Sequence, residues 1–223
     1  MFMLAPRSLR HILPFHIIGV ILTTVTVIIE GTELKILLAL MALCSFIWGF
    51  FLAWFFRDPV RECPENEDEI YSPADGTILK AEIVEKRLFV AIRMSPFNVH
   101  LNRAPVEGEV TNLEEIEGRH LPVYFSKGPE TNYRKISSFN TQWGNLKVVQ
   151  IAGIFARNIE QWVKIGQKVT AGQKIGMIRF GSQTNLIIEE INNVKLLVKP
   201  GDKVNAGITV MAVRSEVGDE KDE

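Results

Sequence analysis

The chain has 223 residues, which is enough for one ordinary domain and a small appendage but not for two full-sized domains. Its 25 lysine and arginine residues nearly balance its 26 aspartate and glutamate residues, so the overall charge indicates neither a nucleic-acid partner nor a polyanionic substrate. The two cysteines, Cys44 and Cys63, lie inside and just beyond an apolar stretch, which excludes a disulfide framework and a thiolate metal cluster.

Two long apolar segments lie near the N-terminus. Residues 12–29 contain no acidic residue, lysine or arginine, and residues 36–56 are rich in leucine, phenylalanine and tryptophan. As helices they would extend about 27 and 31 Å, close to the hydrocarbon thickness of a bilayer. A cleaved signal peptide would have one short apolar core, so the second segment favours a membrane-spanning pair. Pro14 and His16 in the first segment keep open the alternative of a buried or monotopic helical hairpin.

The link between these segments is too short to carry the chain back across a bilayer, which predicts an antiparallel hairpin with both ends on one side. Arg7 and Arg10 precede the hairpin and Arg57 and Arg61 follow it, whereas the turn has only Lys35. The positive-inside rule therefore predicts that both ends, and everything after the hairpin, lie in the cytoplasm.

A polar linker follows at residues 57–69, with two prolines and six acidic residues. This composition is typical of a solvated connector. The soluble part begins near Ile70. We therefore predict a membrane-anchoring helical hairpin over residues 1–60 and a single further domain over residues 61–223.

Two repeats in the soluble part indicate its fold. Lys164-Ile-Gly-Gln-Lys-Val-Thr-Ala-Gly172 recurs 35 residues later as Lys199-Pro-Gly-Asp-Lys-Val-Asn-Ala-Gly207, and a weaker pair joins Pro73-Ala-Asp-Gly-Thr-Ile78 with Pro105-Val-Glu-Gly-Glu-Val110. Both are too short to be solenoid units. Each copy has a glycine-containing turn beside a short strand pattern, so the repeats indicate paired β-turn units. The Val-x-Ala-Gly units resemble the turns of the biotinyl/lipoyl-type barrel-sandwich fold, and that resemblance implies the architecture.

Strand patterns are frequent after residue 70, at residues 88–93, 146–152, 174–179, 185–191, 194–198 and 208–214. A helical period is rare there, and residues 156–163 are the one candidate helix. The predicted fold class is mainly β (α+β). It consists of a barrel-sandwich-like antiparallel β domain with one or two short helices, preceded by a two-helix transmembrane hairpin.

Three segments combine residues that could carry chemistry. They are Tyr71-Ser-Pro-Ala-Asp-Gly-Thr77, Met94-Ser-Pro-Phe-Asn-Val-His-Leu-Asn-Arg-Ala-Pro105 and Ile178-Arg-Phe-Gly-Ser-Gln-Thr184. Each alone is a weak signal, because Asp-Gly usually marks a turn, a single histidine is usually structural and Gly-Ser is common. Together and in this order they resemble the phosphatidylserine decarboxylase family, as do Phe56-Arg-Asp-Pro59 and Gln150-Ile-Ala-Gly-Ile-Phe-Ala-Arg157. The resemblance extends over almost all of the soluble part and matches the family's short form, which has an N-terminal membrane hairpin.

The resemblance implies a proenzyme that cuts itself between Gly181 and Ser182. Residues 1–181 would form the large chain and residues 182–223 the small chain, and Ser182 would become the cofactor, an N-terminal pyruvoyl group. Attack of the Ser182 Oγ on the Gly181 carbonyl requires an approach to about 3 to 3.5 Å. Glycine tolerates the bent backbone and has no Cβ in the way. The ester so formed would lose the serine Cα proton, break its Cβ–O bond and hydrolyse to pyruvoyl and ammonia.

The Ser182 hydroxyl needs a base, and His100 is the candidate. Asp75 would fix the tautomer of His100 and stabilise its imidazolium, as in other hydroxyl–histidine–carboxylate triads. Ser182, His100 and Asp75 are the predicted catalytic residues. The pyruvoyl group would form a Schiff base with the amine of a serine headgroup and act as an electron sink while CO₂ leaves. The product would be an ethanolamine phospholipid, made from phosphatidylserine or, with ether-linked isoprenoid tails, archaetidylserine.

The histidine segment differs from that of longer family members, which have His-x-x-His-x-Pro. Here Arg103 stands in place of the second histidine, so His100 is expected to serve both self-cleavage and decarboxylation. Arg103 is instead a candidate to bind the lipid phosphate or carboxylate. Gln183 follows Ser182 where short forms tend to have arginine, and His120 is equally compatible with a structural and a functional role.

The remaining predictions concern metals, location and partners. No His, Cys or Asp cluster has the spacing of metal ligands, so no metal is predicted. The predicted location is the cell membrane, with the catalytic domain facing the cytoplasm. The predicted partners are the phospholipid substrate and the large and small chains of one precursor, with a homodimer as a candidate assembly and no nucleic acid.

Two non-catalytic alternatives share the repeat pattern. A biotinyl or lipoyl carrier would place a modifiable lysine at a hairpin tip between the half-repeats, but residues 176–193 contain no lysine. A membrane-anchored barrel-sandwich adaptor would usually contain a long hairpin with heptads, and the sequence has no such pattern. The enzyme is therefore the favoured interpretation.

Overall fold

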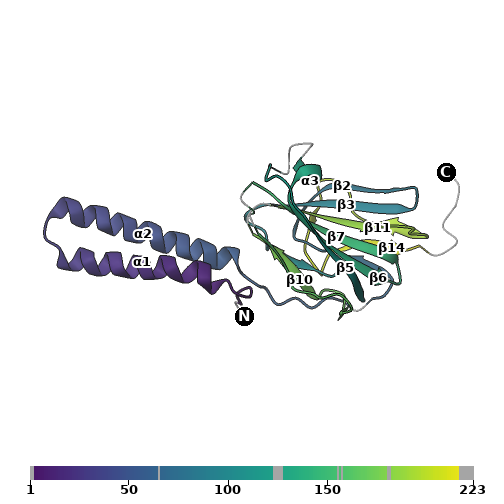
Figure 1. Cartoon of the computed structure of the whole chain (residues 1–223), viewed down its shortest axis with the longest axis horizontal. Helices are drawn as coiled ribbons and strands as arrows, with labels where there is room; N and C mark the ends of the chain where they lie inside the picture. Colours follow the sequence, from purple (N-terminus) through teal and green to yellow (C-terminus); the bar gives the residue numbers. More distant parts are fainter. Residues whose placement is uncertain are drawn as a thin grey trace. The chain divides into compact units, whose positions relative to one another are not determined.

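The computed structural model describes residues 3–64, 66–122, 128–154, 156, 158–179 and 182–215. The chain divides into two compact units, Met1–Val60 and Arg61–Glu223, and each is described by itself. Figure 1 shows that the first unit is helical and the second is built mainly of strands. The predicted fold class, mainly β with an N-terminal helical hairpin, is confirmed.

The first unit is a pair of helices, α1 (Leu9–Ile28) and α2 (Thr32–Phe55). Their 20 and 24 residues are long and apolar enough to cross a membrane, by length and composition. Many of their large apolar side chains are exposed, among them Val27 at 77 % and Phe50 at 65 %. An apolar surface of this kind is compatible with membrane anchoring.

The two helices pack through small residues that receive rings from the opposite helix. A Cβ at Gly49 would come within 2.5 Å of the His16 ring, and one at Gly19 would meet a phenylalanine ring at 2.8 Å. Ser45 Oγ also donates a hydrogen bond to the Phe15 carbonyl across the pair, at 2.6 Å. Small residues at the contact and hydrogen bonds between helices are typical of helices that pack in membranes. His16 therefore belongs to this helix contact.

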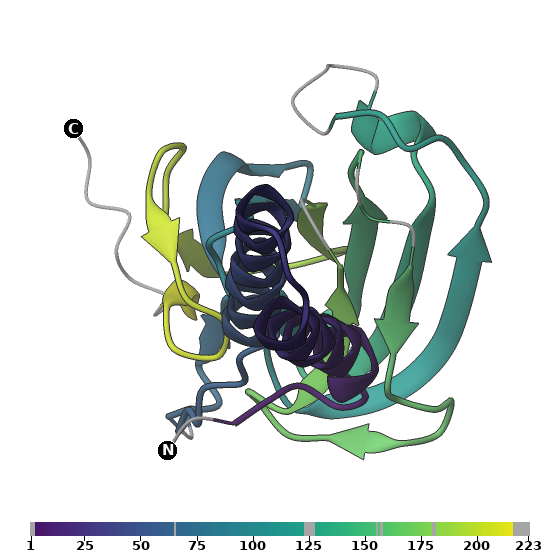
Figure 2. The ribbon, with the colours of Figure 1, turned by 90° about the vertical axis from the view of Figure 1, so that its left-hand side faces the viewer.

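The second unit is built from one large sheet and two small ones. Among the described residues, eight strands form the large sheet and two groups of three form the small sheets. Figure 2 shows that the large sheet curves strongly, into a half-barrel. One short helix in the described part, α3 (Gly128–Thr131), precedes β6. The strands are β1 (Glu69–Tyr71), β2 (Gly76–Val84), β3 (Arg87–Met94), β4 (Leu101–Arg103), β5 (Gly108–Ile116), β6 (Arg134–Thr141), β7 (Gly144–Ala152), β8 (Ile159–Gln161), β9 (Lys168–Val169), β10 (Lys174–Ile178), β11 (Ser182–Ile188), β12 (Val194–Leu196), β13 (Lys203–Val204) and β14 (Val210–Arg214).

The order of the large sheet reflects the two sequence repeats. The order is β13-β2-β3-β11-β7-β6-β5-β9. The weaker repeat supplies the starts of β2 and β5, the stronger repeat supplies β9 and β13, and β2 pairs with β13 as β5 pairs with β9. The small sheets, β1-β14-β12 and β4-β10-β8, correspond in the same way. The unit therefore consists of two similar halves, and β11 and β7 meet at its centre.

The glycines that end the two copies of the stronger repeat, Gly172 and Gly207, lie against each other. Both have positive φ, 76° and 69°, a conformation that favours glycine. A Cβ at Gly207 would lie 3.3 Å from the Gly172 Cα, and one at Gly172 would lie 2.4 Å from the Cβ of Cys63. The repeat therefore needs glycine here for the turn and for the close approach.

All six predicted strands correspond to observed strands, namely β3, β7, β10, β11, β12 and β14. However, β11 begins at Ser182, three residues earlier than predicted. The predicted helix at residues 156–163 is wrong, because β8 lies there and pairs with β10. Ala156, Ile159 and Val163 have helical spacing, but they reach the core from an extended segment.

Candidate active site

Ser182 is the first residue of β11, one of the two central strands, and its side chain is fully buried. It lies in register with Met94 at the end of β3 and with Ala152 at the end of β7. Its Oγ donates a hydrogen bond to the Met94 Sδ at 3.3 Å. A thioether sulfur is a weak acceptor, so a stronger base can displace this contact. Gly181, the other half of the predicted cleavage site, lies outside the described residues.

The chain on the other side of the predicted cleavage bond is held by β10 and its neighbours. The backbone N of Ile178 donates to the His100 carbonyl at 3.2 Å. Arg179 forms a largely buried ion pair with Glu160 of β8. The predicted cleavage bond therefore lies between two segments that the fold holds in place. The segment before the bond forms a backbone hydrogen bond with His100.

A buried hydrogen-bond network joins β11, which Ser182 begins, to β4, which follows His100. Asn102 Nδ2 donates to Thr184 Oγ1 at 2.9 Å, and Gln150 Nε2 donates to Asn102 Oδ1 at 2.8 Å. Successive side chains of a strand alternate between its faces, so Ser182 shares a face of β11 with Thr184. The segment that follows His100 is therefore hydrogen-bonded to the strand that Ser182 begins, and the approach of His100 to Ser182 stays a prediction.

His100 is fully buried, and the turn before it sets the orientation of its ring. The Nδ1 lies 3.0 Å from the Asn98 carbonyl oxygen. A carbonyl oxygen only accepts, so Nδ1 carries the proton in this contact and the neutral ring has its lone pair on Nε2. Asn98 is itself held, because its Oδ1 accepts hydrogen bonds from the backbone N and the Oγ of Ser95, both at 2.8 Å. This tautomer suits a general base that acts through Nε2.

Asp75 is buried, but its partners differ from the predicted one. Its two carboxylate oxygens pair with the Arg61 guanidinium at 2.5 and 2.8 Å, and one also accepts a hydrogen bond from the backbone N of Ala206 at 2.8 Å. Within the described ranges, no hydrogen bond joins Asp75 to His100. The Nδ1 of His100 therefore faces the Asn98 carbonyl in this structure, and the contact of Asp75 with His100 stays a prediction. Asp75 connects the linker residue Arg61 to Ala206, in the second copy of the stronger repeat.

Arg103 is buried on the opposite face of β4 from Asn102. Its Nη1 donates to the Gly172 carbonyl at 2.8 Å. A Cβ at Gly207 would lie 3.0 Å from the Arg103 Cδ. The structure therefore places Arg103 at the two repeat turns and does not bring it to the Ser182 face. Its binding of a lipid headgroup stays a prediction.

Gln183 does not face Ser182 either, and His120 lies at the surface. Gln183 points to the other side of the sheet, where its Nε2 donates to Asn185 Oδ1 at 2.7 Å. His120 is exposed, and its ring centroid lies 5.9 Å from that of Tyr133. The side chain at position 183 is therefore not oriented toward the Ser182 hydroxyl.

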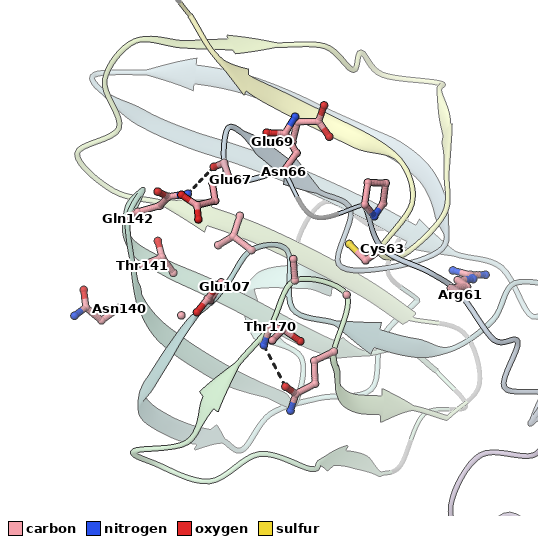
Figure 3. Close-up of a pocket in the computed structure, with 16 residues that line it drawn as sticks. Arg61, Cys63, Asn66, Glu67, Glu69, Glu107, Asn140, Thr141, Gln142 and Thr170 are labelled. Atoms are coloured by element: carbon pink, nitrogen blue, oxygen red, sulfur yellow. Dashed lines mark hydrogen bonds between the residues drawn. The ribbon is translucent and has the colours of Figure 1, made fainter.

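A cavity of about 970 Å³ lies in a different part of this unit. Figure 3 shows that its walls come from the linker, from the segment that leads into β5, from the turn between β6 and β7 and from the segment between β9 and β10, with Arg61, Cys63, Glu69 and Glu107 among its lining residues. The described residues that line it include neither Ser182 nor any of its hydrogen-bond network. This cavity is therefore not the candidate active site.

Two groups near this cavity have raised pKa values. Burial raises the pKa of the Cys63 thiol, an effect that the positive charge of Arg103 partly offsets. The pKa of Tyr71 is raised by burial and by the hydrogen bond that its hydroxyl donates to Glu69 Oε2 at 2.5 Å. Both groups therefore stay neutral at physiological pH, and neither is a candidate nucleophile.

Comparison with known proteins decides the family. The family profile described as phosphatidylserine decarboxylase matches residues 48–212. The chain belongs to the phosphatidylserine decarboxylase family. A phosphatidylserine decarboxylase proenzyme of Streptomyces coelicolor is 43 % identical over 159 residues, which cover 71 % of each chain.

Archaeal relatives in the same family carry a different lipid in their names. A protein of Methanothermobacter thermautotrophicus, provisionally named an archaetidylserine decarboxylase proenzyme, is 42 % identical over 73 % of this chain and 80 % of its own. A protein of Methanococcoides burtonii with the same provisional name is 35 % identical over 94 % of this chain and 96 % of its own. The family assignment favours a decarboxylase proenzyme over the carrier and the adaptor.

The residues around Ser182 and His100 were not singled out from the sequence. Asn98, Asn102 and Thr184 all lie within the segments that carry the family resemblance. The available signal was alternation, because Asn102 and Thr184 each follow a predicted catalytic residue by two positions, the spacing of one strand face. Gln150 has no such signal, since its partner Asn102 is 48 residues away in the chain.

Proposed function

We propose that this chain is a proenzyme that cuts itself between Gly181 and Ser182 and then decarboxylates a serine phospholipid. Residues 1–181 would form the large chain, residues 182–223 would form the small chain, and Ser182 would become an N-terminal pyruvoyl group. The substrate would be phosphatidylserine or archaetidylserine, and the product an ethanolamine phospholipid. The observation that carries the proposal is the burial of Ser182 at the head of β11, a strand that is hydrogen-bonded through Thr184 to Asn102, two residues after the buried His100.

Self-cleavage begins with attack of the Ser182 Oγ on the Gly181 carbonyl. His100 Nε2 accepts the hydroxyl proton, and the Asn98 carbonyl holds the ring in the tautomer that makes this transfer feasible. The peptide C–N bond breaks, an ester forms and the amine is released. Loss of the Cα proton then expels the large chain as a carboxylate from Cβ. Water hydrolyses the remaining enamine to a ketone and ammonia.

The surroundings of Ser182 fit an uncharged ketone. Its register partners Met94 and Ala152 are apolar and buried, and Thr184, one step along the same face, is neutral. A pyruvoyl group at this position would supply a carbonyl that forms a Schiff base with the headgroup amine and withdraws electrons from the bond to the departing carboxylate. His100 would hold the proton that the product carbon needs, and Asn102 would keep the strand of His100 in place.

Asp75 enters the proposal as a positioning residue. Its bidentate pair with Arg61 and its contact with Ala206 tie three distant parts of the chain together at the start of β2. The β2 strand pairs with β3, and β3 ends at Met94 beside Ser182. Asp75 would therefore act on self-cleavage through the alignment of these strands.

We also propose that the helical hairpin spans the cell membrane, with both of its ends and the β unit in the cytoplasm. The support is the length of the two helices and the excess of arginine at the ends of the hairpin over its turn. Labelling of single cysteines placed at Met3 and at Thr32, with a reagent that cannot cross membranes, tests this orientation. The candidate assembly is a homodimer, which light scattering of the purified protein tests.

Intact-mass analysis of the purified chain, with and without Ser182→Ala, tests the proposed function. We expect two chains from the parent protein, the smaller one blocked at its N-terminus, and one uncut chain from the variant. The purified parent should release CO₂ from a serine phospholipid, and the variant should release none. A single full-length chain in both samples would remove the proenzyme proposal.

A further inference from the structure

The edge of the large sheet where Ser182 lies carries two exposed apolar side chains at the tips of turns. Ser182, Met94 and Ala152 are in register, so β3 and β7 end at the same edge at which β11 begins. Phe97 stands three residues beyond Met94 and is 69 % exposed, and Ile154 stands two residues beyond Ala152 and is 51 % exposed. Large apolar side chains at projecting tips are the usual means by which a folded domain enters a lipid interface.

Both apolar tips are held by hydrogen-bonded turns. The backbone N of Asn98 donates to the Ser95 carbonyl at 3.0 Å, which closes the turn that presents Phe97. The backbone N of Ala156 donates to the carbonyl of Gly153 at 3.2 Å, and Ile154 lies in the bend after β7. The backbone beside both exposed side chains is therefore hydrogen-bonded next to the active-site strands, so that little conformational entropy is lost when the side chains are inserted.

Basic side chains accompany these tips. Arg93, next to Met94 on β3, is exposed, and so is Arg119, whose backbone bonds to Tyr133 beside the end of β7. In the described part of the chain neither Arg93 nor Arg119 forms an ion pair. Arg134 and Lys135 lie at the same edge, where the exposed acidic residues of the described part are Glu115, which pairs with Lys135, Glu117 and Glu130. Among the described residues, four basic side chains against three acidic ones favour an anionic surface over a neutral one.

We propose that this edge of the β unit enters the interface of an anionic phospholipid bilayer. Phe97 and Ile154 insert among the headgroups, and Arg93 and Arg119 bind lipid phosphates. The inference rests on the proposed function, because the proposed substrate is an anionic lipid of that bilayer. It adds a second membrane contact, independent of the helical hairpin, which positions the Ser182 edge at the depth of the serine headgroup.

Fluorescent labels in the full-length protein test the contact directly. Single cysteines at Phe97, Ile154 or Val84, in a background that lacks the two native cysteines, are coupled to an environment-sensitive dye. Val84 is the matched control, because it is 55 % exposed and lies at the opposite end of the β3 ladder from Met94, roughly 24 Å away along the strand. The protein is placed in vesicles that contain phosphatidylglycerol and doxyl-labelled phosphatidylcholine.

We expect the labels at Phe97 and Ile154 to shift to the blue in vesicles and to be quenched by doxyl lipid, and the label at Val84 to do neither. Equal emission and quenching at all three positions would overturn the proposal. A blue shift that is already present in detergent and that doxyl lipid does not quench would also overturn it, because the residues would then lie between two copies of the chain.

Kinetics separate this inference from the proposed function. The double variant Phe97→Ser, Ile154→Ser should decarboxylate phosphatidylserine in vesicles roughly tenfold or more slowly, since loss of the two apolar insertions together weakens surface binding by at least about a factor of ten. Its turnover of soluble short-chain phosphatidylserine should be unchanged. An equal loss on both substrates would overturn the interface. Quenched labels in a protein that decarboxylates neither lipid would support the interface and remove the proposed function.

Discussion

The pair between Arg61 and Asp75 offers a sharp test of how the fold holds the site. The side chains of Arg61 and Asp75 are only 13 % and 6 % exposed, and the contact is bidentate. The variant Arg61→Ala would leave a buried carboxylate whose charge is no longer compensated. Loss of one partner of a buried pair costs about 3–5 kcal/mol. We expect the lower end of that range, about 3 kcal/mol, because the backbone N of Ala206 still donates to Asp75.

The assay is thermal unfolding of the full chain in detergent, followed by near-ultraviolet circular dichroism. For a unit of this size a loss of about 3 kcal/mol lowers the Tm by roughly 6–12 °C. The double variant Arg61→Ala, Asp75→Ala should unfold at a higher temperature than Arg61→Ala alone, because it leaves no unpaired charge. The control is Arg87→Ala, at an exposed position without an ion pair in the described structure, which should change stability by no more than about 0.5 kcal/mol.

Self-cleavage of the same variants distinguishes the two possible roles of Asp75. If Asp75 acts through strand alignment, Arg61→Ala and Asp75→Asn should slow self-cleavage by similar factors, and Arg61→Lys should restore part of it. If Asp75 instead contacted His100 during the reaction, Asp75→Asn would stop cleavage while Arg61→Ala left it nearly intact. The second pattern would refute the reasoning. A Tm for Arg61→Ala within roughly 2 °C of the parent value would also refute it, because the expected decrease is at least about 6 °C.

Three further predictions concern single side chains. The variant His100→Ala should leave mostly uncut chain on a denaturing gel, because an unassisted serine hydroxyl is a weak nucleophile at neutral pH; normal processing would assign the base elsewhere. Thr184→Val should cost about 1–3 kcal/mol and slow self-cleavage, since it removes the acceptor of the buried Asn102 amide, and Thr184→Ser should recover most of both. Because burial raises the pKa of Cys63, its alkylation by iodoacetamide at pH 8 should be slower than that of glutathione and should accelerate as the pH rises. The raised pKa of Cys63 also affects folding stability. It contributes stability at pH values below the ordinary thiol pKa, and this contribution is lost as the pH rises through the pKa of the folded state. Alkylation at the rate of a free thiol would contradict the burial of this side chain.

Local pattern was sufficient for six of the fourteen strands in the described part and failed where apolar spacing was ambiguous. The strands β3 and β7 were predicted because their apolar residues mark short β segments between turns. The start of β11 was missed because Ser182, Gln183 and Thr184 are polar on both faces, although all three are buried. The segment that forms β8 has the spacing of a helix, but pairing with β10 provides its backbone hydrogen bonds and overrides the local preference.

The sequence pointed to the candidate catalytic residues, whereas the tertiary structure determined their hydrogen-bond partners. The order of the three motifs in the sequence was enough to point to the family, to Ser182 and to His100, since a motif records residue types along one chain. The partners of those residues depend on which strands lie side by side, and no local pattern specifies that. Only the folded structure decided that Asn102 forms a hydrogen bond with Thr184 and that Asp75 binds Arg61. Buried polar groups take whichever partner the packing brings within reach, because leaving them unpaired costs more than any local preference can offset.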